Sequence, residues 1–273
     1  TELSLTHGPA SISSYCYMVY AYLLATTHRE FAESRAVGRF ALALLERSGA
    51  AEVACKTRFV FGCFAHFSCP LQEVVAQFDS AHRVGLRTGD AVYLSYACSH
   101  MLLARLNLGE GLGDLDAACG EYFALVRRTQ VASSLAVQTV ARQFIACLQG
   151  RSHDTSTLSG PDFDAEAFLA AADASSLSFA VRWQLLAHLE LLVIFGHHAL
   201  ALAALRAVQQ RVDGGLSFYF TTKLPLLAAL TLAANYPEMP PDQQRAALAE
   251  LQRHRAQLGE WAAVCPENYA AMQ

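Results

Sequence analysis

The sequence predicts an all-α fold, a right-handed α-solenoid in which antiparallel helix pairs stack on one another. Apolar residues recur at intervals of three and four rather than two, which is the period of helices. Gly, Pro or a short polar turn separates the apolar segments, as in helix–turn–helix units. Three segments also share one layout of small and bulky residues. Such repeats indicate units that bury their apolar faces against their neighbours.

The repeated layout has a small or β-branched residue, a bulky residue four positions later, and Ala three after that. It occurs in the segments 29–49, 71–90 and 112–130, at intervals of about 40 residues. That interval exceeds the roughly 34 residues of a tetratricopeptide repeat, so the units are tetratricopeptide-like with longer helices. The triplets are Ala36/Phe40/Ala43, Val74/Phe78/Ala81 and Ala117/Glu121/Ala124. Glu121 departs from the expected aromatic residue.

Small residues at these places let the second helix of a unit approach its neighbour closely. We therefore expect five alanines to be close-approach points between helices: Ala36, Ala43, Ala81, Ala117 and Ala124.

The first helices of the pairs are rich in aromatic and aliphatic residues. In chain order, the sequence predicts about twelve helices. We expect first helices at 12–26, 52–68, 91–107, 133–149, 176–196 and 216–236. Second helices are expected at 29–49, 71–90, 112–130, 197–214 and 240–264.

One polar stretch, residues 150–164, interrupts this alternation and is rich in Ser, Thr, Gly and Asp. We interpret it as a solvated surface loop between two sub-arrays rather than as a binding loop, because loops of this composition usually connect elements. Asp164 is expected to cap a short helix that begins after it. The whole of 1–273 is interpreted as a single helical-repeat domain, and as a piece of a longer multidomain protein.

Composition excludes several classes of function. The net charge is −4, and no stretch gathers Lys and Arg into a stripe, which argues against nucleic-acid binding. No segment has the roughly 20 uninterrupted apolar residues of a membrane span. Eight cysteines are spread singly through apolar surroundings, and no signal peptide precedes them. We interpret them as reduced, mostly buried thiols of a cytoplasmic protein.

The stretch FGCFAHFSC carries three side chains of the types that bind zinc, Cys63, His66 and Cys69. On a helix they point in different directions, and Pro70 ends the helix directly after them. We expect packing between helices and no zinc site.

Known catalytic patterns are also missing from the sequence. The glycine-rich stretch 108–115 lacks the Lys-Ser/Thr of a phosphate-binding loop and is interpreted as a turn. No nucleophile elbow and no kinase catalytic loop occurs. His197 and His198 are expected at a turn, and Glu190 is interpreted as a buried polar contact in an apolar helix. We expect no catalytic residues and no cofactor.

Three stretches resemble a known family: SLTHGPASISSYCYMVYAYLL, GLRTGDAVYLSYACSHMLLARLNLGEGL and LGEWAAVCPENYAAM. They are similar to the helical-repeat region of large bacterial signalling kinases, and the terminal W-A-x-x-C-P-E-N-Y is the most specific of them. In that family a Ser/Thr-kinase-like domain and a STAND-type AAA ATPase precede the repeats, and a GAF domain and a histidine kinase commonly follow. The resemblance implies a regulatory sensor region rather than a catalytic domain.

Two functions stay open. The first is a protein-interaction and relay module whose partners are the ATPase, kinase and GAF domains or a protein effector. The second is a small-molecule sensor whose ligand is enclosed by the repeats. An open groove would favour the former and an enclosed pocket the latter.

The candidate binding residues are polar-tipped side chains on first helices, which line the concave face of a solenoid. They are Tyr15, Tyr22, Arg58, His66, Tyr93, Tyr96, His100, Arg142 and Arg182. The alternative is that half or more of the tyrosines pack between helices.

Overall fold

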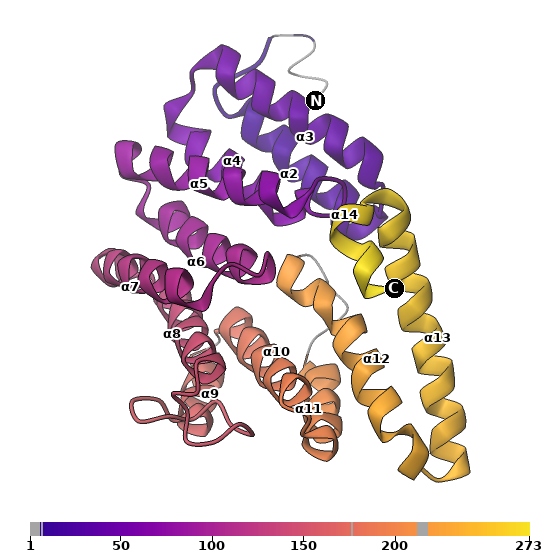
Figure 1. Cartoon of the computed structure of the whole chain (residues 1–273). Helices are drawn as coiled ribbons and strands as arrows, with labels where there is room; N and C mark the ends of the chain where they lie inside the picture. The colour runs from indigo at the N-terminus through magenta and orange to yellow at the C-terminus, as the bar shows by residue number, and fades with distance from the viewer. Residues whose placement is uncertain (1–5, 7, 176, 212–217) are drawn as a thin grey trace.

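The fold was obtained as a computed structural model, shown in Figure 1, which describes residues 6, 8–175, 177–211 and 218–273. Those ranges contain thirteen α-helices and no β-strand, so the all-α prediction is confirmed. An isolated β-bridge pairs Gly160 with Phe163. The stretch SLTHG and three expected helices, 176–196, 197–214 and 216–236, include residues that lie outside the described ranges.

The α-helices follow one another along the whole chain. They are α2 (Ser13–Leu23), α3 (Phe31–Ser48), α4 (Ala51–Ala65), α5 (Leu71–Thr88), α6 (Ala91–Asn107), α7 (Leu112–Thr129), α8 (Ala132–Leu148), α9 (Ala165–Ala174), α10 (Ser178–Ile194), α11 (His198–Arg211), α12 (Leu224–Asn235), α13 (Pro241–Val264) and α14 (Pro266–Tyr269). A π-helical turn, η1 (Leu24–His28), continues α2. Three 3₁₀ turns are η2 (Tyr219–Lys223), η3 (Tyr236–Glu238) and η4 (Ala270–Met272).

Helices that follow each other in the sequence pack as pairs, such as α2 with α3, α4 with α5, α7 with α8, and α12 with α13. The even-numbered helices also touch in succession, from α2 through α4, α6, α8 and α10 to α12. These are the aromatic-rich segments that the sequence identified as first helices. They form a continuous row, which we call the inner row.

Glycines end two of the partner helices. Gly49 follows α3 at φ 64°, and Gly89 follows α5 at φ 73°. In each case the glycine N–H donates to a carbonyl in the last helical turn, that of Leu45 or of Gly85. Other residues rarely adopt this left-handed conformation, so glycine fixes where each helix stops and the chain turns.

The expected repeat register holds in α5 alone. Val74, Phe78 and Ala81 are all buried there. In α3 and α7 the register is wrong, because the expected residues face solvent. The exposed residues are Ala36, Phe40, Ala43, Ala117, Glu121 and Ala124.

The face that α3 buries begins two residues earlier than expected, with Ser34, Gly38 and Ala41. Gly38 lets α3 approach α4 closely, since an added Cβ there would lie 2.9 Å from the ring of Phe61 in α4. In α7 the buried face likewise begins two residues earlier, at Leu115. Alanine is a strong helix former on outward faces as well, so its presence alone does not reveal which face is buried.

The register seen in the structure predicts different effects for substitutions on the buried and the exposed faces. Ala41→Leu and Ala81→Leu should each lower the free energy of unfolding by about 1–3 kcal/mol, because both alanines are fully buried and the added atoms overpack the interface. Ala36→Leu and Ala124→Leu lie on exposed faces and should change it by less than about 0.5 kcal/mol. Urea denaturation of the four variants distinguishes this register from the expected one, which requires Ala36→Leu and Ala124→Leu to be destabilised as strongly as Ala81→Leu and makes no such demand of Ala41→Leu.

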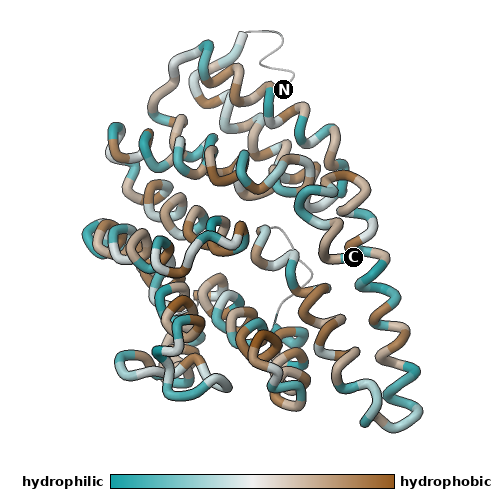
Figure 2. Tube along the Cα trace, viewed as in Figure 1, coloured by the Kyte–Doolittle hydropathy of each residue, from teal (hydrophilic) through white to brown (hydrophobic). Residues whose placement is uncertain are grey.

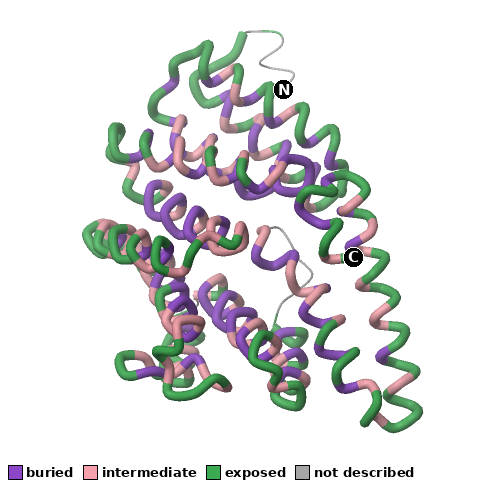
Figure 3. The backbone as a smooth tube through the Cα atoms, viewed as in Figure 1, coloured by how far each residue is buried: buried purple, intermediate pink, exposed green. Residues whose placement is uncertain are grey.

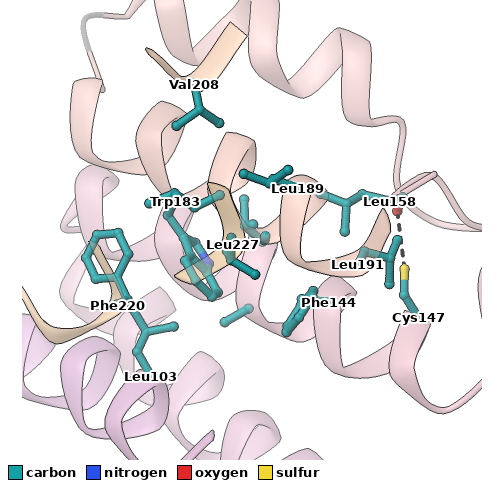
Figure 4. Close-up of a cluster of buried hydrophobic side chains, with 14 of the residues drawn as sticks. Leu103, Phe144, Cys147, Leu158, Trp183, Leu189, Leu191, Val208, Phe220 and Leu227 are labelled. Carbon is teal, nitrogen blue, oxygen red and sulfur yellow. Dashed lines mark hydrogen bonds between the residues drawn. The ribbon is translucent and has the colours of Figure 1, made fainter. Parts of the chain in front are cut away.

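Two large groups of buried apolar side chains form the core, along the facing sides of the helices (Figures 2 and 3). One group joins α6 to α13 and is centred on Trp183, which lies beside Phe144 and Phe220 (Figure 4). The other joins α2 to α6 and also contains Trp261 and Tyr269 from the end of the chain. The last helices therefore return to the first ones, as Figure 1 shows for α13 and α14.

Polar anchors hold the loop between α8 and α9 against the helices. His188 Nε2 lies 3.0 Å from the carbonyl oxygen of Ser156, and Leu158 is buried. The carboxylate of Asp164 accepts from the backbone N–H groups of Glu166 and Ala167, which confirms the expected cap. Residues 150–164 are thus partly packed rather than wholly solvated.

The structure also shows where two other polar residues with a predicted place lie, Glu190 and His197. Glu190, expected as a buried polar contact, forms a largely buried ion pair with Lys223 of η2. His197 lies in the turn before α11, as expected, and its Nε2 is 2.8 Å from the hydroxyl of Thr155. None of the helices in the described ranges has the length and apolarity that a bilayer crossing requires.

Candidate functional site

An aromatic groove of about 240 Å³ lies on the inner row, between α4, α6, α8 and α10 and the segment before η2. Phenylalanine and tyrosine rings make most of its wall, and three serines and a histidine supply the polar atoms. The lining residues are Phe59, Tyr96, Ser99, His100, Ser133, Ser134, Val137, Phe179 and Phe218.

His100 stands among four phenylalanine rings. Its ring centroid is 5.2 Å from that of Phe59, 5.7 Å from Phe78, 5.1 Å from Phe179 and 4.9 Å from Phe218. Among the residues that the structure describes, none hydrogen-bonds to the imidazole. Burial among these rings lowers the pKa of His100 to about 3, since a charged imidazolium would lose its hydration. The side chain is therefore neutral at physiological pH.

Two serines give the groove different polar groups. The Ser99 hydroxyl donates to the carbonyl of Ser95 at 3.1 Å. Ser134 is 1% exposed, and its hydroxyl has no hydrogen-bond partner in the described part of the chain. A buried hydroxyl without a partner destabilises the fold, so a hydrogen-bonding group that reached it would be stabilising.

Four of the nine predicted binding residues come together here. Tyr96 and His100 line the groove, and Tyr93 packs against Tyr96 with ring centroids 5.8 Å apart. The Tyr93 hydroxyl is 3.1 Å from that of Tyr15, which brings α2 to the same cluster. Burial, and next the contact with Tyr15, raises the pKa of Tyr93 above its ordinary value.

The other five predicted residues lie apart from the groove. Tyr22 packs edge-on against Phe64, and Arg58 pairs with Glu46 at 3.5 Å. Arg182 donates from Nε to the carbonyl of Ser178. The two that remain are Arg142, which is exposed over the ring of Phe123, and His66, which is fully buried.

Sequence reasoning missed most of the groove wall. Phe59 and Phe179 lie on expected first helices, but only polar-tipped side chains were selected there. Their aromatic character on the inner row was the available signal. Phe218 belongs to the expected first helix 216–236, but α12 begins only at Leu224, and Phe218 reaches the groove from the irregular segment before η2.

The end of the chain makes a second arrangement, which we call the C-terminal clasp and define as Asn268 and Tyr269. The Asn268 side chain accepts from the backbone N–H of Leu71 at 2.9 Å. It donates to the carbonyls of His66 at 2.7 Å and Cys69 at 2.8 Å. The Tyr269 hydroxyl lies 2.7 Å from Nδ1 of His66. The CPENY motif thus joins the end of the chain to the turn between α4 and α5.

Two of the three side chains that were candidates for zinc, His66 and Cys63, make other contacts in the structure. His66 contacts Tyr269, and the Cys63 thiol donates to the carbonyl of Phe59 at 3.3 Å. Burial raises the pKa of the Cys63 thiol, which disfavours the thiolate that zinc requires. In the described ranges, no three His, Cys, Asp or Glu side chains are placed to hold a metal. That the chain binds no zinc stays a prediction.

The cysteines are free thiols, and all but Cys16 are buried, which confirms that they are mostly buried. Burial raises the pKa of Cys55, Cys98 and Cys119 to about 12. These thiols are therefore protonated and unreactive.

A pH-dependent loss of stability follows from His100. Its pKa is about 3 in the folded chain against 6.5 for the free side chain. Between those values the unfolded chain binds a proton that the folded chain does not, so stability falls as the pH drops through this window. His100→Phe should reduce the fall between about pH 7 and pH 4.5, measured as the urea midpoint. The exposed His28 is the control, and a His28→Phe variant with the same effect would contradict the assignment.

No protein-family model matches the sequence, and searches of curated proteins and of solved structures likewise give no match.

Proposed function

We propose that the chain is a non-catalytic recognition and relay module of a bacterial signalling kinase, and that it binds its effector in the aromatic groove. The observation that carries the proposal is the groove itself, where side chains from four helices of the inner row converge. Aromatic side chains on a concave surface are suited to recognition, because they supply large contact areas at low entropic cost.

The arrangement of the helices supports the same proposal. Successive contacts along the even-numbered helices are those expected of a right-handed α-solenoid of tetratricopeptide-like pairs, whose first helices line the concave face. The resemblance to signalling kinases makes the neighbouring ATPase, kinase and GAF domains the recipients of the signal. A cytoplasmic location belongs to this proposal as well.

The chemistry of the groove suits binding better than acid–base catalysis. A general base works best with a pKa near the working pH. The pKa of His100 lies far below that range, and burial raises that of Tyr93 above it. Neither group is poised to exchange a proton with a substrate at neutral pH.

The second candidate function is a small-molecule sensor. The unpartnered hydroxyl of Ser134 at the groove favours it, since a small ligand can reach a buried serine more readily than a protein surface can. A sensor of this kind still passes its signal to neighbouring domains. The two functions differ in what fills the groove.

The relay is tested in a protein that joins this chain to its ATPase and kinase neighbours. Tyr96→Ala should change the ATPase or kinase rate, because Tyr96 lines the groove. Tyr20→Ala should not, because Tyr20 is exposed on α2 away from it. The chain alone should turn over no ATP. A non-catalytic role would be refuted if the chain alone hydrolysed ATP and a substitution within it abolished that activity. Equal ATPase or kinase rates for Tyr96→Ala and Tyr20→Ala would refute the relay.

A further inference from the structure

We infer that the groove takes a neutral, flat molecule of two fused rings that carries a hydroxyl group. The inference rests on the proposed binding role of the groove, and it names the chemical class of the ligand. Four features of the lining carry it: the volume, the apolar walls, two unpartnered polar side chains, and the lack of charge.

The volume sets the size of the ligand. The groove holds about 240 Å³. An engineered protein cavity of about 150 Å³ binds benzene, whereas sites for drug-sized ligands are about 300–1,000 Å³. One aromatic ring underfills the groove, and two fused rings come closest to it.

The walls favour a flat ring system. Phe59, Phe179 and Phe218 line the groove, and the last two meet edge to face with centroids 5.1 Å apart. Such rings present both faces and edges, which suits offset or edge-on packing of another ring. Val137 adds an aliphatic surface from α8. A flexible chain would gain less from these walls, since it would lose more conformational freedom on binding.

Two side chains on the groove have no hydrogen-bond partner among the described residues. Ser134 has a buried hydroxyl with a proton to donate, and neutral His100 has a ring nitrogen with a lone pair to accept. A ligand hydroxyl is both acceptor and donor, so it can pair with either group. In the described residues, two serine hydroxyls are buried without a partner, those of Ser14 and Ser134. Ser14 lies in α2, whereas Ser134 is among the residues that line the groove.

The lining also decides the charge of the ligand. None of the described residues around the groove is Asp, Glu, Lys or Arg. An ionised ligand would leave water without gaining an opposite charge, which is strongly unfavourable. A phenol-like hydroxyl on an otherwise apolar ring system avoids that loss.

The test uses three probes that differ in one substituent: 2-naphthol, naphthalene and 2-naphthoate. Titration calorimetry on this chain should find 2-naphthol the tightest binder. Ser134→Ala should weaken 2-naphthol by about threefold to tenfold, the effect of one hydrogen bond, and leave naphthalene unchanged. Ser14→Ala removes an equally buried, unpartnered hydroxyl elsewhere and should change neither affinity.

A second variant, Val137→Phe, fills the groove and should abolish binding of all three probes, with thermal melts confirming that it folds. If Val137→Phe does not fold, the comparison of Ser134→Ala with Ser14→Ala tests the inference by itself. Failure of 2-naphthol to bind, tighter binding of 2-naphthoate, or equal weakening by both serine variants would each overturn the inference. These results are independent of the relay, which is read from catalytic rates. If Tyr96→Ala changes the catalytic rate but none of the three probes binds, the groove holds a protein partner instead.

Discussion

Replacing Asn268 by alanine is expected to lower the free energy of unfolding by roughly 3–5 kcal/mol. The asparagine is 8% exposed and makes three hydrogen bonds to the backbone at the turn between α4 and α5. Its removal leaves the N–H of Leu71 and the carbonyls of His66 and Cys69 without those partners. An unsatisfied buried group costs about 1–3 kcal/mol, and water relieves part of the total.

Asn107→Ala is the matched control. Asn107 is partly buried and donates to the carbonyl of Leu103 within its own helix, so it joins nothing distant in the sequence. We expect it to lower stability by less than about 1 kcal/mol, because its side-chain oxygen is buried without a partner among the described residues and removing that oxygen offsets part of the lost hydrogen bond. Guanidinium denaturation of both variants gives the comparison. Similar values for Asn268→Ala and Asn107→Ala would show that the clasp does not hold the last helices in place.

Trp183→Ala is expected to lower the free energy of unfolding by about 3–5 kcal/mol, as is usual for a large aromatic residue in a core. Trp183 is 2% exposed and lies within 5.9 Å of Phe144 and 5.5 Å of Phe220, centroid to centroid. Removing the indole opens a cavity at the junction of α8, α10 and η2. Leu86→Ala, at an exposed position in α5, should change stability by less than about 0.5 kcal/mol.

Trp183→Phe should restore most of that loss for a specific reason. The indole Nε1 is buried and has no hydrogen-bond partner among the described residues. Phenylalanine keeps an aromatic ring in the core and removes the unsatisfied donor, which offsets part of the lost packing. Thermal denaturation of the two Trp183 variants measures the difference. Equal midpoints would show that the core does not depend on the ring at this position.

The sequence was sufficient to predict the helices but not their register. Apolar spacing and the glycine turns depend on neighbours within a few residues, and both are visible locally. Which face of α3 is buried depends instead on where the rings of Phe61 and Phe64 lie, and they belong to the next helix. Ala36 and Ala41 look alike in the sequence, yet only the latter is buried.

The groove could be predicted in part, and the clasp could not. Tyr96 and His100 were identified because polar-tipped residues on first helices were expected to face inward. The partners of Asn268 are backbone atoms about two hundred positions earlier, and no side-chain pattern marks them. The role of His66 was likewise hidden, since its contact with Tyr269 spans the same distance.

The return of α14 to the first helices constrains how the protein folds and diversifies. In an open stack each unit touches only its neighbours, so units can be gained or lost with little effect elsewhere. Here the Asn268–Leu71 bond spans 197 positions. The loop-closure entropy of that span must be overcome before the bond contributes, so we expect the ends to meet late in folding. Insertion of another helix pair would move the CPENY segment away from its backbone partners, which fixes the number of pairs.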